Sequence, residues 1–413
     1  MEPKADLRFP TQQELLFPLL EVLAENGPMQ AKDACQAVAE KIDLRPELRN
    51  VSVSYDDGRH HTNLFDRKTR WVRQNATIAQ LIPKTPIGIW SLSEEGHRAL
   101  TMARPGVVIC VSRDEFGHVL WAEALSAMGH IDHGSVNAII TSPPFPLNRQ
   151  REYGGWEPDR YLDILLEHIA AMKPLLTNDG SLVVSLGEVY LKGVPALNPY
   201  QEELVVAMRK LGWSLCGRHV YVNPASPKTT PWVTKSRIRC ARATETFYWW
   251  SPTPYPKANN REVLQPYSNR FLQTLAAGGE IRARKGGARQ SHPGLRFRQN
   301  NGGRIPLNFT FAGHEGATSA YSRYCAANGL PRHPALMSAE VTEHFVRLVT
   351  DTGDLLYDPF GGSLRVAEVC KRLGRRYLAS EKCLEYLKGG FGRLDPQTIE
   401  DFTGALLGGP PPG

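Results

Sequence analysis

The chain has 413 residues, a net charge of +7 and a sequence pI of about 9.0. This length predicts two or three structural units, and the basic balance predicts an acidic partner such as nucleic acid. No apolar stretch is long enough to cross a bilayer and no secretory signal is apparent, so we expect no membrane role and a cytoplasmic location; the seven cysteines lack Cys-x-x-Cys spacing, which argues against a disulfide framework and a zinc site.

The first 103 residues have a helical pattern of their own. Helices are predicted at 14–25, 30–41 and 65–82, then a short hairpin, a wing strand at 86–92 and a last helix. Ser93 suits the N-cap of that last helix, and Glu94 and Glu95 suit its first turn.

The third of these helices is basic, with Arg67, Lys68, Arg70 and Arg73. Its Arg70-Trp71 pair and the later Gly88-Ile89-Trp90 resemble the winged-helix N-terminal domain of Mrr-type restriction proteins. The resemblance implies an α+β winged-helix domain over 1–103 in which Arg70 and Arg73 contact DNA phosphates. Dimerisation, or a solvated helix face around a buried Trp71, are the alternatives.

A stiff motif, Thr141-Ser142-Pro143-Pro144-Phe145, ends the apolar run 136–140. Proline lacks an N–H and restricts the residue before it, so the carbonyls here stay free of ladder bonding and can accept protons from an amino group. The aromatic ring offers a face for stacking a planar base. A strand followed by a proline turn is the plainer interpretation.

A strand, glycine turn and helix are predicted 215 residues further on, at 354–373. The turn contains Asp358-Pro359-Phe360-Gly361-Gly362-Ser363. Glycines let the backbone approach a ligand, and the helix N-terminus offers unpaired N–H groups, as in nucleotide sites of doubly wound sheets. The next strand ends at Glu381, where an acid can bind ribose hydroxyls.

Together the two motifs resemble the β-class amino-methyltransferases of DNA, which use S-adenosylmethionine and release S-adenosylhomocysteine. The resemblance covers roughly residues 105 to 395 and implies a doubly wound mixed α/β sheet of the Rossmann-like methyltransferase type. A catalytic domain over 104–251 and 333–397 is expected, with 252–332 as target-recognition region. It gives Ser142, Pro143, Pro144 and Phe145 the catalytic role. Cofactor binding falls to Asp358, Phe360, Gly361, Gly362, Ser363, Glu381, Glu123, His333 and Pro334.

Two of these assignments are open at the level of sequence. Glu123 follows Trp121-Ala122 where the family often has Gly-Asp against the adenine, and a solvated helix-start Glu is equally compatible. The His333-Pro334-Ala335 stretch stands where the family begins a helix, although Ser338 replaces a second proline that often follows.

The first residue of the catalytic motif indicates the base. In the resembled family a serine is typical of enzymes acting on the N4 amine of cytosine, whereas Asp or Asn is typical of those acting on adenine N6. Ser142 therefore favours cytosine, with adenine as the alternative. The carbon-5 route needs a Pro-Cys nucleophile, and no cysteine here follows a proline.

Basic segments predict the contacts to double-stranded DNA. No acid occurs between Glu280 and Glu315, a span that carries Arg282, Arg284, Lys285, Arg289, Arg296 and Arg298. A disordered or merely soluble loop is the alternative. A base inside a duplex cannot reach a recessed pocket, so the target base is expected to flip out of the helix. Another basic patch, with Lys235 and Arg237 near Trp232, is expected beside this flipped base or as a brace for the sheet.

Other function classes stay open. A DNA-binding regulator with an inactive methyltransferase core is one, and an RNA methyltransferase is another. A homodimer and a cognate restriction endonuclease are further partners compatible with the resemblance.

Overall fold

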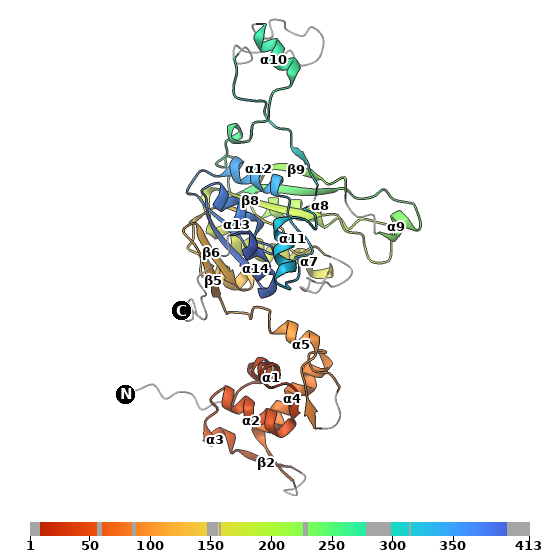
Figure 1. Cartoon of the computed structure of the whole chain (residues 1–413), viewed down its shortest axis with the longest axis vertical. Helices are drawn as coiled ribbons and strands as arrows, with labels where there is room; N and C mark the ends of the chain where they lie inside the picture. Colours follow the sequence, from red (N-terminus) through yellow and green to blue (C-terminus); the bar gives the residue numbers. More distant parts are fainter. Residues whose placement is uncertain are drawn as a thin grey trace, which may run out of the picture. The chain divides into compact units, whose positions relative to one another are not determined.

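The structure is a computed structural model that describes residues 9–55, 60–84, 88–146, 156, 158–225, 230–277, 299–313 and 315–394. The chain divides into two compact units, Met1–Met102 and Ala103–Gly413 (Figure 1). No helix within the described ranges combines the length and apolar character needed to cross a membrane.

The N-terminal unit packs helices around one apolar core. Its elements are α1 (Gln12–Asn26), β1 (Met29–Gln30), α2 (Ala31–Lys41), α3 (Pro46–Arg49), β2 (Ser52–Tyr55), β3 (His60–Asn63), α4 (Leu64–Ile78), β4 (Ile89–Trp90) and α5 (Glu94–Ala99). Leu19, Val38 and Val72 bring α1, α2 and α4 together in this core. As predicted, the Ser93 hydroxyl caps α5, accepting from the Gly96 N–H at 2.9 Å.

Two expectations for this unit are corrected. The hairpin β2–β3 precedes α4 instead of following it, and β4 pairs with β1. Trp71 is 48% exposed on α4, so the alternative of a basic face around a buried Trp71 is wrong. The helix buries Phe65, Thr69 and Val72 instead, because these lie on its other face.

The C-terminal unit is built on a nine-stranded mixed sheet. Its order is β11-β9-β10-β8-β7-β12-β13-β6-β5. The strands are β5 (Ile109–Arg113), β6 (Gly117–Trp121), β7 (Val136–Thr141), β8 (Leu176–Gly187), β9 (Ser214–Val222), β10 (Thr244–Ser251), β11 (Phe309–Phe311), β12 (Leu355–Asp358) and β13 (Arg376–Glu381). The central strands β8, β7, β12, β13 and β6 run parallel, whereas β10 and β5 are antiparallel to their neighbours.

Helices cover both faces of this sheet (Figure 1). One core packs against α6 (Ala124–Met128), α7 (Tyr161–Met172) and α8 (Tyr200–Lys210), the other against α12 (Ala339–Val349), α13 (Arg365–Arg372) and α14 (Leu384–Gly390). Ile139 of β7 lies in the first core and its neighbours Ala138 and Ile140 in the second, because alternate side chains of a strand point to opposite faces. The doubly wound α/β fold is therefore confirmed.

The chain order reverses between β7 and β12. From β7 the chain continues to β8 on one side, and from β12 to β13 on the other. The carboxyl ends of two adjacent parallel strands thus diverge at this point, which is where open α/β sheets bind ligands. Both sequence motifs, at Thr141 and Asp358, stand at these two strand ends.

Part of the stretch 252–332 packs on the nine-stranded sheet and its helices. It contains η3 (Asn260–Val263), α10 (Asn269–Ala276), β11 and α11 (Ala320–Ala327). β11 pairs in parallel with β9, and α11 packs against α14 and η5 (Phe391–Arg393), burying Tyr321 and Cys325. The expected helix start at His333 is also wrong, since α12 begins at Ala339 with Ser338 as its cap.

Candidate active site

A cavity of about 240 Å³ lies at the carboxyl ends of β7 and β12, where the chain order reverses. Most of the side chains that the sequence assigns to catalysis and cofactor binding line it: Glu123, Ser142, Pro143, Pro144, Phe145, His333, Asp358, Phe360, Gly361, Gly362, Ser363 and Glu381. Pro334 is exposed and does not line the cavity. Residues from strands that are far apart in sequence therefore face one space.

A buried hydrogen bond joins the two motifs. The Thr141 hydroxyl at the end of β7 donates to Asp358 Oδ1 at the end of β12 at 2.7 Å. The same oxygen accepts from the Phe360 N–H at 3.2 Å, so the aspartate also fixes the start of the glycine turn. Because Ser142 directly follows Thr141, this bond sets the position of the proline motif relative to the glycine turn.

Asp358 is 3% exposed, and burial raises the pKa of its carboxyl to about 7. The hydrogen bonds from Thr141 and from the Phe360 amide lower that pKa, whereas the nearby Glu381 charge raises it. Burial thus favours the protonated form of this carboxyl far more than in an exposed aspartate.

The glycine turn is held against the end of β13. The Gly361 N–H donates to the Ser380 carbonyl at 2.8 Å, and the Gly362 N–H donates to Glu381 Oε2 at 3.0 Å. Glu381 Oε1 accepts from the Cys383 N–H at 2.9 Å. A carboxylate has about four lone-pair sites, so Glu381 keeps acceptor capacity toward the cavity it lines.

Phe145 rests on a glycine that the sequence did not single out. A Cβ at Gly187, the last residue of β8, would come within 2.7 Å of the Phe145 ring. The Tyr200 hydroxyl donates to the Gly187 carbonyl and holds this backbone in place. The ring therefore packs against bare backbone at the cavity wall.

Two further aromatic side chains line the cavity without having been predicted. Trp156 and His168 lie 4.7 Å apart by ring centroid, and each is within 5.6 Å of the Phe360 ring. Burial lowers the pKa of His168, and its Nδ1 lies 2.8 Å from the Ile164 carbonyl. Trp156 is an isolated aromatic residue, and His168 lies within the apolar pattern of α7. Neither has a sequence pattern that would predict a place in the cavity.

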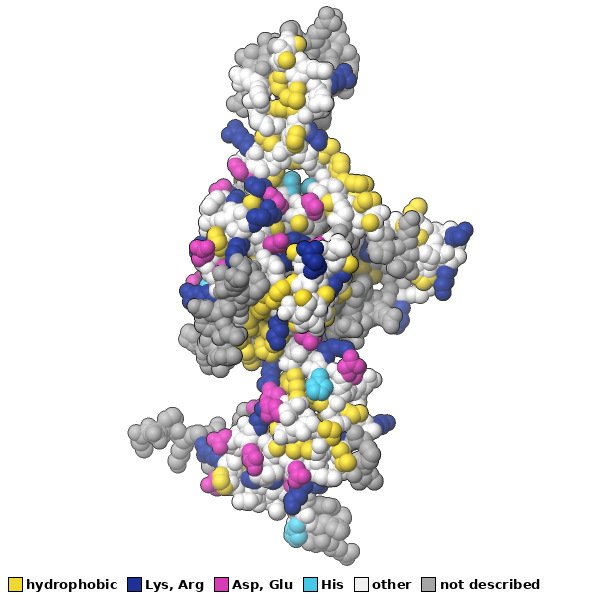
Figure 2. Space-filling model, in the orientation of Figure 1, with side chains coloured by type: hydrophobic (Ala, Val, Ile, Leu, Met, Phe, Trp, Pro, Cys, Tyr) yellow, Lys and Arg dark blue, Asp and Glu magenta, His cyan; other side chains and the backbone are white. Residues whose placement is uncertain are grey.

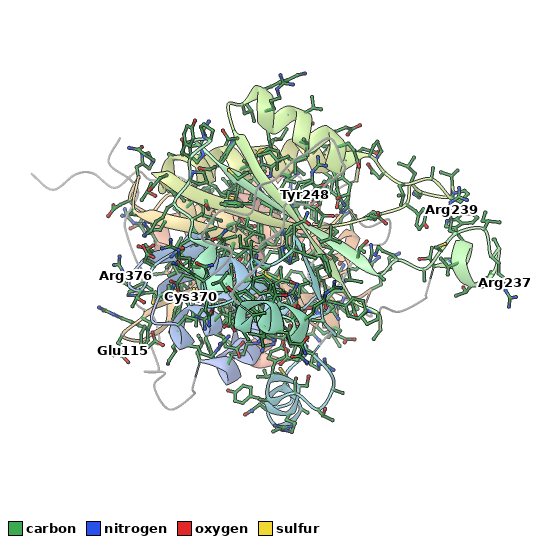
Figure 3. All side chains as sticks on the ribbon, turned by 90° about the horizontal axis from the view of Figure 1, so that it is seen from above. Glu115, Arg237, Arg239, Tyr248, Cys370 and Arg376 are labelled. Atoms are coloured by element: carbon green, nitrogen blue, oxygen red, sulfur yellow. The ribbon has the colours of Figure 1, made fainter. Side chains whose placement is uncertain are left out.

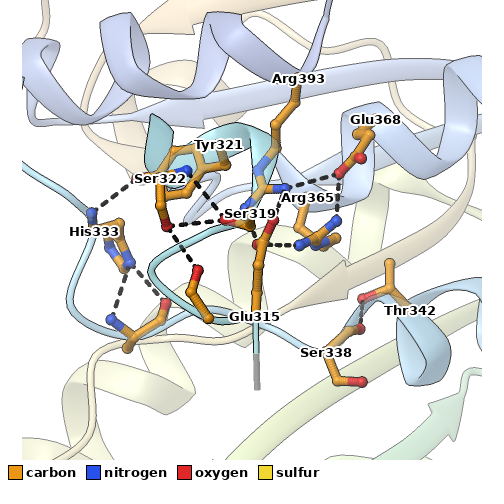
Figure 4. Close-up of polar contacts among 12 residues, drawn as sticks. Glu315, Ser319, Tyr321, Ser322, His333, Ser338, Thr342, Arg365, Glu368 and Arg393 are labelled. Atoms are coloured by element: carbon orange, nitrogen blue, oxygen red, sulfur yellow. Dashed lines mark hydrogen bonds and ion pairs between the residues drawn. The ribbon is translucent and has the colours of Figure 1, made fainter. Parts of the chain in front are cut away.

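An ion network supports the far side of the glycine turn (Figure 4). Arg365, which lines the cavity at the start of α13, pairs with Glu315 and Glu368, and Arg393 pairs with the same two carboxylates. Burial would raise the pKa of Glu315, but the two arginines outweigh it and the net shift is downward.

This network also reaches His333. The Arg393 guanidinium lies over the Tyr321 ring at 4.2 Å, and the Tyr321 hydroxyl accepts from the His333 N–H at 2.9 Å. A Cβ at Gly362, where φ is +48°, would come within 3.1 Å of the His333 ring. Glycine suits this position because its φ is positive and a side chain would crowd the His333 ring.

None of the described residues expected to contact DNA is part of the cavity lining. Lys235 and Arg237 are exposed beside α9 (Pro231–Thr234), on the extension seen in Figure 3. On α4, Arg70 is exposed and Arg73 half-buried. Arg282, Arg284, Lys285, Arg289, Arg296 and Arg298 lie outside the described residues.

Comparison with known proteins agrees with this geometry. A family profile described as a DNA methylase matches residues 136–390, which include both motifs and all three strand ends. The chain belongs to the DNA methylase family. A profile described as the Mrr N-terminal domain matches residues 13–102 of this DNA methylase.

Among similar proteins is the Type II methyltransferase M.PvuII of Proteus hauseri, 31% identical over 300 residues that cover 71% of this DNA methylase and 89% of M.PvuII. The Type II methyltransferase M.Cfr9I of Citrobacter freundii is 25% identical, covering 66% and 85% of the two chains. A solved structure titled PvuII DNA methyltransferase (cytosine-N4-specific) superposes with a TM-score of 0.56 at 28% identity, covering 71% of this chain and 91% of that one.

Gly187→Ala tests the support of Phe145. The added methyl has to displace the ring, and a shift of about 1 Å in a positioned group can lower turnover by up to about 100-fold. We expect a large loss in methyl transfer with unchanged affinity for the methyl donor, measured by single-turnover kinetics and calorimetry. Gly129→Ala is the control, since that exposed glycine has a φ of −64° and room for a methyl. Equal activity of the Gly187 and Gly129 variants would contradict the role given to Gly187.

Asp358→Asn tests the raised pKa. A folded-state pKa of about 7, above the ordinary aspartate pKa of about 3.8, means that the folded protein keeps a proton on Asp358 between these pH values. The group's contribution to stability therefore falls as pH rises from about 4 to 7, by on the order of a few kcal/mol. We expect the unfolding free energy of the wild type to drop relative to the variant as pH is raised from 5 to 8 in denaturant titrations. A pH-independent difference would contradict the assignment.

Proposed function

We propose that this DNA methylase transfers a methyl group from S-adenosylmethionine to the N4 amine of cytosine in duplex DNA. One observation carries the proposal: Ser142 lies at the end of β7, bonded through Thr141 to the aspartate of the glycine turn, and faces the same cavity. The relatives that match most of the chain are Type II methyltransferases, and the solved one is titled cytosine-N4-specific. A serine in place of Asp or Asn favours cytosine over adenine.

The donor set at the cavity fits the proposed cofactor. Glu381 offers carboxylate lone pairs to ribose hydroxyls, while Phe360, Trp156 and His168 provide flat apolar surface for an adenine. Asp358 and the turn from Gly361 to Ser363 lie beside them, at the N-terminal end of α13. When bound, S-adenosylmethionine supplies an electrophilic methyl group on a sulfonium.

Ser142 and Pro143 are the proposed acceptors for the target amine. The lone pair of an exocyclic amine is delocalised into the ring, so the nitrogen is a poor nucleophile until it moves toward sp³ geometry. Hydrogen bonds from its two N–H groups to Ser142 Oγ and the Pro143 carbonyl localise that lone pair. Pro144 keeps the segment rigid, so these acceptors need no rearrangement during the reaction.

Phe145 is the proposed platform for the base. Stacking of a base on an aromatic ring is worth roughly 1–3 kcal/mol. That energy offsets part of the few kcal/mol needed to rotate a base out of the duplex, which the recessed cavity requires. Direct displacement then transfers the methyl with no covalent adduct to the protein, so no cysteine is needed.

The remaining assignments are part of the same proposal. The catalytic domain spans 104–251 and 333–397, 252–332 reads the target sequence, and the N-terminal unit contacts DNA through α4, where Arg70 and Trp71 are exposed. Lys68 is already engaged, donating to the Pro10 carbonyl at 3.2 Å. A cognate restriction endonuclease, a homodimer and an intracellular location complete the proposal.

Nucleoside mass spectrometry tests this function directly. Unmethylated plasmid DNA incubated with the protein and isotopically labelled S-adenosylmethionine should yield labelled N4-methylcytosine. N6-methyladenine would overturn the base assignment. No labelled nucleoside would favour a DNA-binding regulator over an enzyme.

Ser142→Ala provides the matched variant for that assay. Loss of one charge-stabilising contact in a transition state typically lowers turnover on the order of 100-fold or more. We expect that loss with nearly unchanged affinity for S-adenosylmethionine, because the serine is proposed to touch the base and not the donor. Full activity in the variant would contradict the mechanism.

A further inference from the structure

An extension rises from the sheet edge that carries the active site. It consists of two chain segments, 188–198 after β8 and 223–243 between β9 and β10, which we call the arm. Residues 226–229 of the second segment lie outside the described part of the chain. In Figure 3, Arg237 and Arg239 mark its outer end.

Backbone hydrogen bonds hold the arm in one shape. In the first segment the Leu191 N–H donates to the Ala196 carbonyl and the Asn198 N–H to the Val189 carbonyl, each at 2.8 Å. In the second, the Ile238 N–H closes back on the Trp232 carbonyl at 2.9 Å.

Two arginines join the segments. Arg239 Nε donates to the Pro195 carbonyl at 3.0 Å, and Arg242 donates to the Glu188 carbonyl. These bonds join the described parts of the two segments to each other, which favours a preorganised arrangement.

Apart from Glu188 at its base, the arm carries no acidic side chain to compensate its cations. No Asp or Glu occurs in 189–198 or 223–243. Lys192, Lys235 and Arg237 are exposed, and none of them takes part in an ion pair among the described residues. In Figure 2 the arm shows Lys and Arg side chains at its end with apolar side chains between them. Uncompensated cations on a rigid projection suit contact with phosphates.

Apolar side chains accompany these cations. Ile238 is 50% exposed between Arg237 and Arg239, and Leu191, Val194 and Leu197 of the other segment are 40%, 45% and 48% exposed. Arg237 adopts a positive φ of +54°, a conformation that costs a residue with a Cβ about 1 kcal/mol. The unfavourable backbone geometry of Arg237 thus lies directly beside Ile238, an apolar side chain that is half exposed to solvent.

The base of the arm directly follows the glycine that supports the proposed base platform. Glu188 follows Gly187, the residue against which the Phe145 ring packs. β10 begins opposite the same point, with Glu245 paired to Gly187. Both segments of the arm are therefore rooted beside the residue that supports the Phe145 ring.

We propose that the arm enters a groove of the duplex, with Lys235 and Arg237 on phosphates and Ile238 as a wedge that takes up the stacking space left by the flipped base. This inference rests on the proposed base-flipping function and adds the residue that stabilises the opened duplex. Apolar side chains inserted between base steps stabilise unstacked DNA in this way. Interleaved cations favour DNA over a second copy of this basic chain as the occupant, because like charges would meet at such an interface.

Ile238→Ala separates the wedge from the rest of the reaction. The duplex used is a site that the wild-type protein methylates, found by mapping methylated positions on plasmid DNA, with the target cytosine either paired or mismatched. A mismatched base needs less energy to flip. We expect kcat/KM to fall about tenfold on the paired duplex and less than threefold on the mismatched one. Fluorescence of 2-aminopurine at the target position should fall in parallel.

Two comparisons complete the test. Val206→Ala shortens another exposed apolar side chain, on α8, and should leave kcat/KM unchanged on both duplexes. Lys235→Gln and Arg237→Gln should weaken binding to both duplexes equally and lower the salt slope by about one unit each.

Several outcomes overturn the proposal. Equal losses on paired and mismatched duplexes, or no loss, would remove the wedge role, and a change in oligomeric state with intact kinetics would assign Ile238 to a contact between copies. If the wild type methylates no DNA, the proposed function fails instead, which is a separate result.

Discussion

The active site depends on one buried hydrogen bond, from the Thr141 hydroxyl to Asp358. It joins the ends of two central parallel strands at the point where the chain order reverses. The partners are 217 residues apart in sequence, so nothing local fixes their separation. A buried carboxyl left without this donor would lose on the order of 1–3 kcal/mol of hydrogen bonding, which gives the arrangement its specificity. The proline motif follows Thr141 and the glycine turn follows Asp358, so this one bond positions the two motifs relative to each other.

Around this pair, rigidity comes from contacts that leave little room for a side chain. Phe145 packs on the backbone of Gly187, and His333 packs on Gly362. The network of Arg365 and Arg393 with Glu315 and Glu368 adds little to net stability, because burial of charges offsets their attraction. Its effect is positional: it joins the segment after β11 to the start of α13 and to the C-terminal η5, so the turn has one defined orientation.

The sequence predicted the elements whose signals are local. Strand ends at Thr141, Asp358 and Glu381 followed from apolar runs stopped by proline, glycine or an acid, and the structure brings these ends to one cavity. Gly187, Trp156 and His168 were missed because their roles arise only from contacts across the fold. The helix start was misplaced at His333 because Ser338, five residues later, is the residue that caps the N-terminus of α12. Assignment of 252–332 as one irregular region overlooked β11, a three-residue strand that only its pairing with β9 reveals.

Thr141→Val tests the central claim most directly. Thr141 is buried and does not line the cavity, and its hydroxyl donates to Asp358, so removal of the hydroxyl tests this bond. The variant keeps the side-chain shape and removes the donor. We expect the affinity for S-adenosylmethionine, measured by calorimetry, to fall about tenfold, the equivalent of 1.4 kcal/mol. The single-turnover rate of methyl transfer should also fall about tenfold. A folded variant with wild-type donor affinity and wild-type rate would contradict the account.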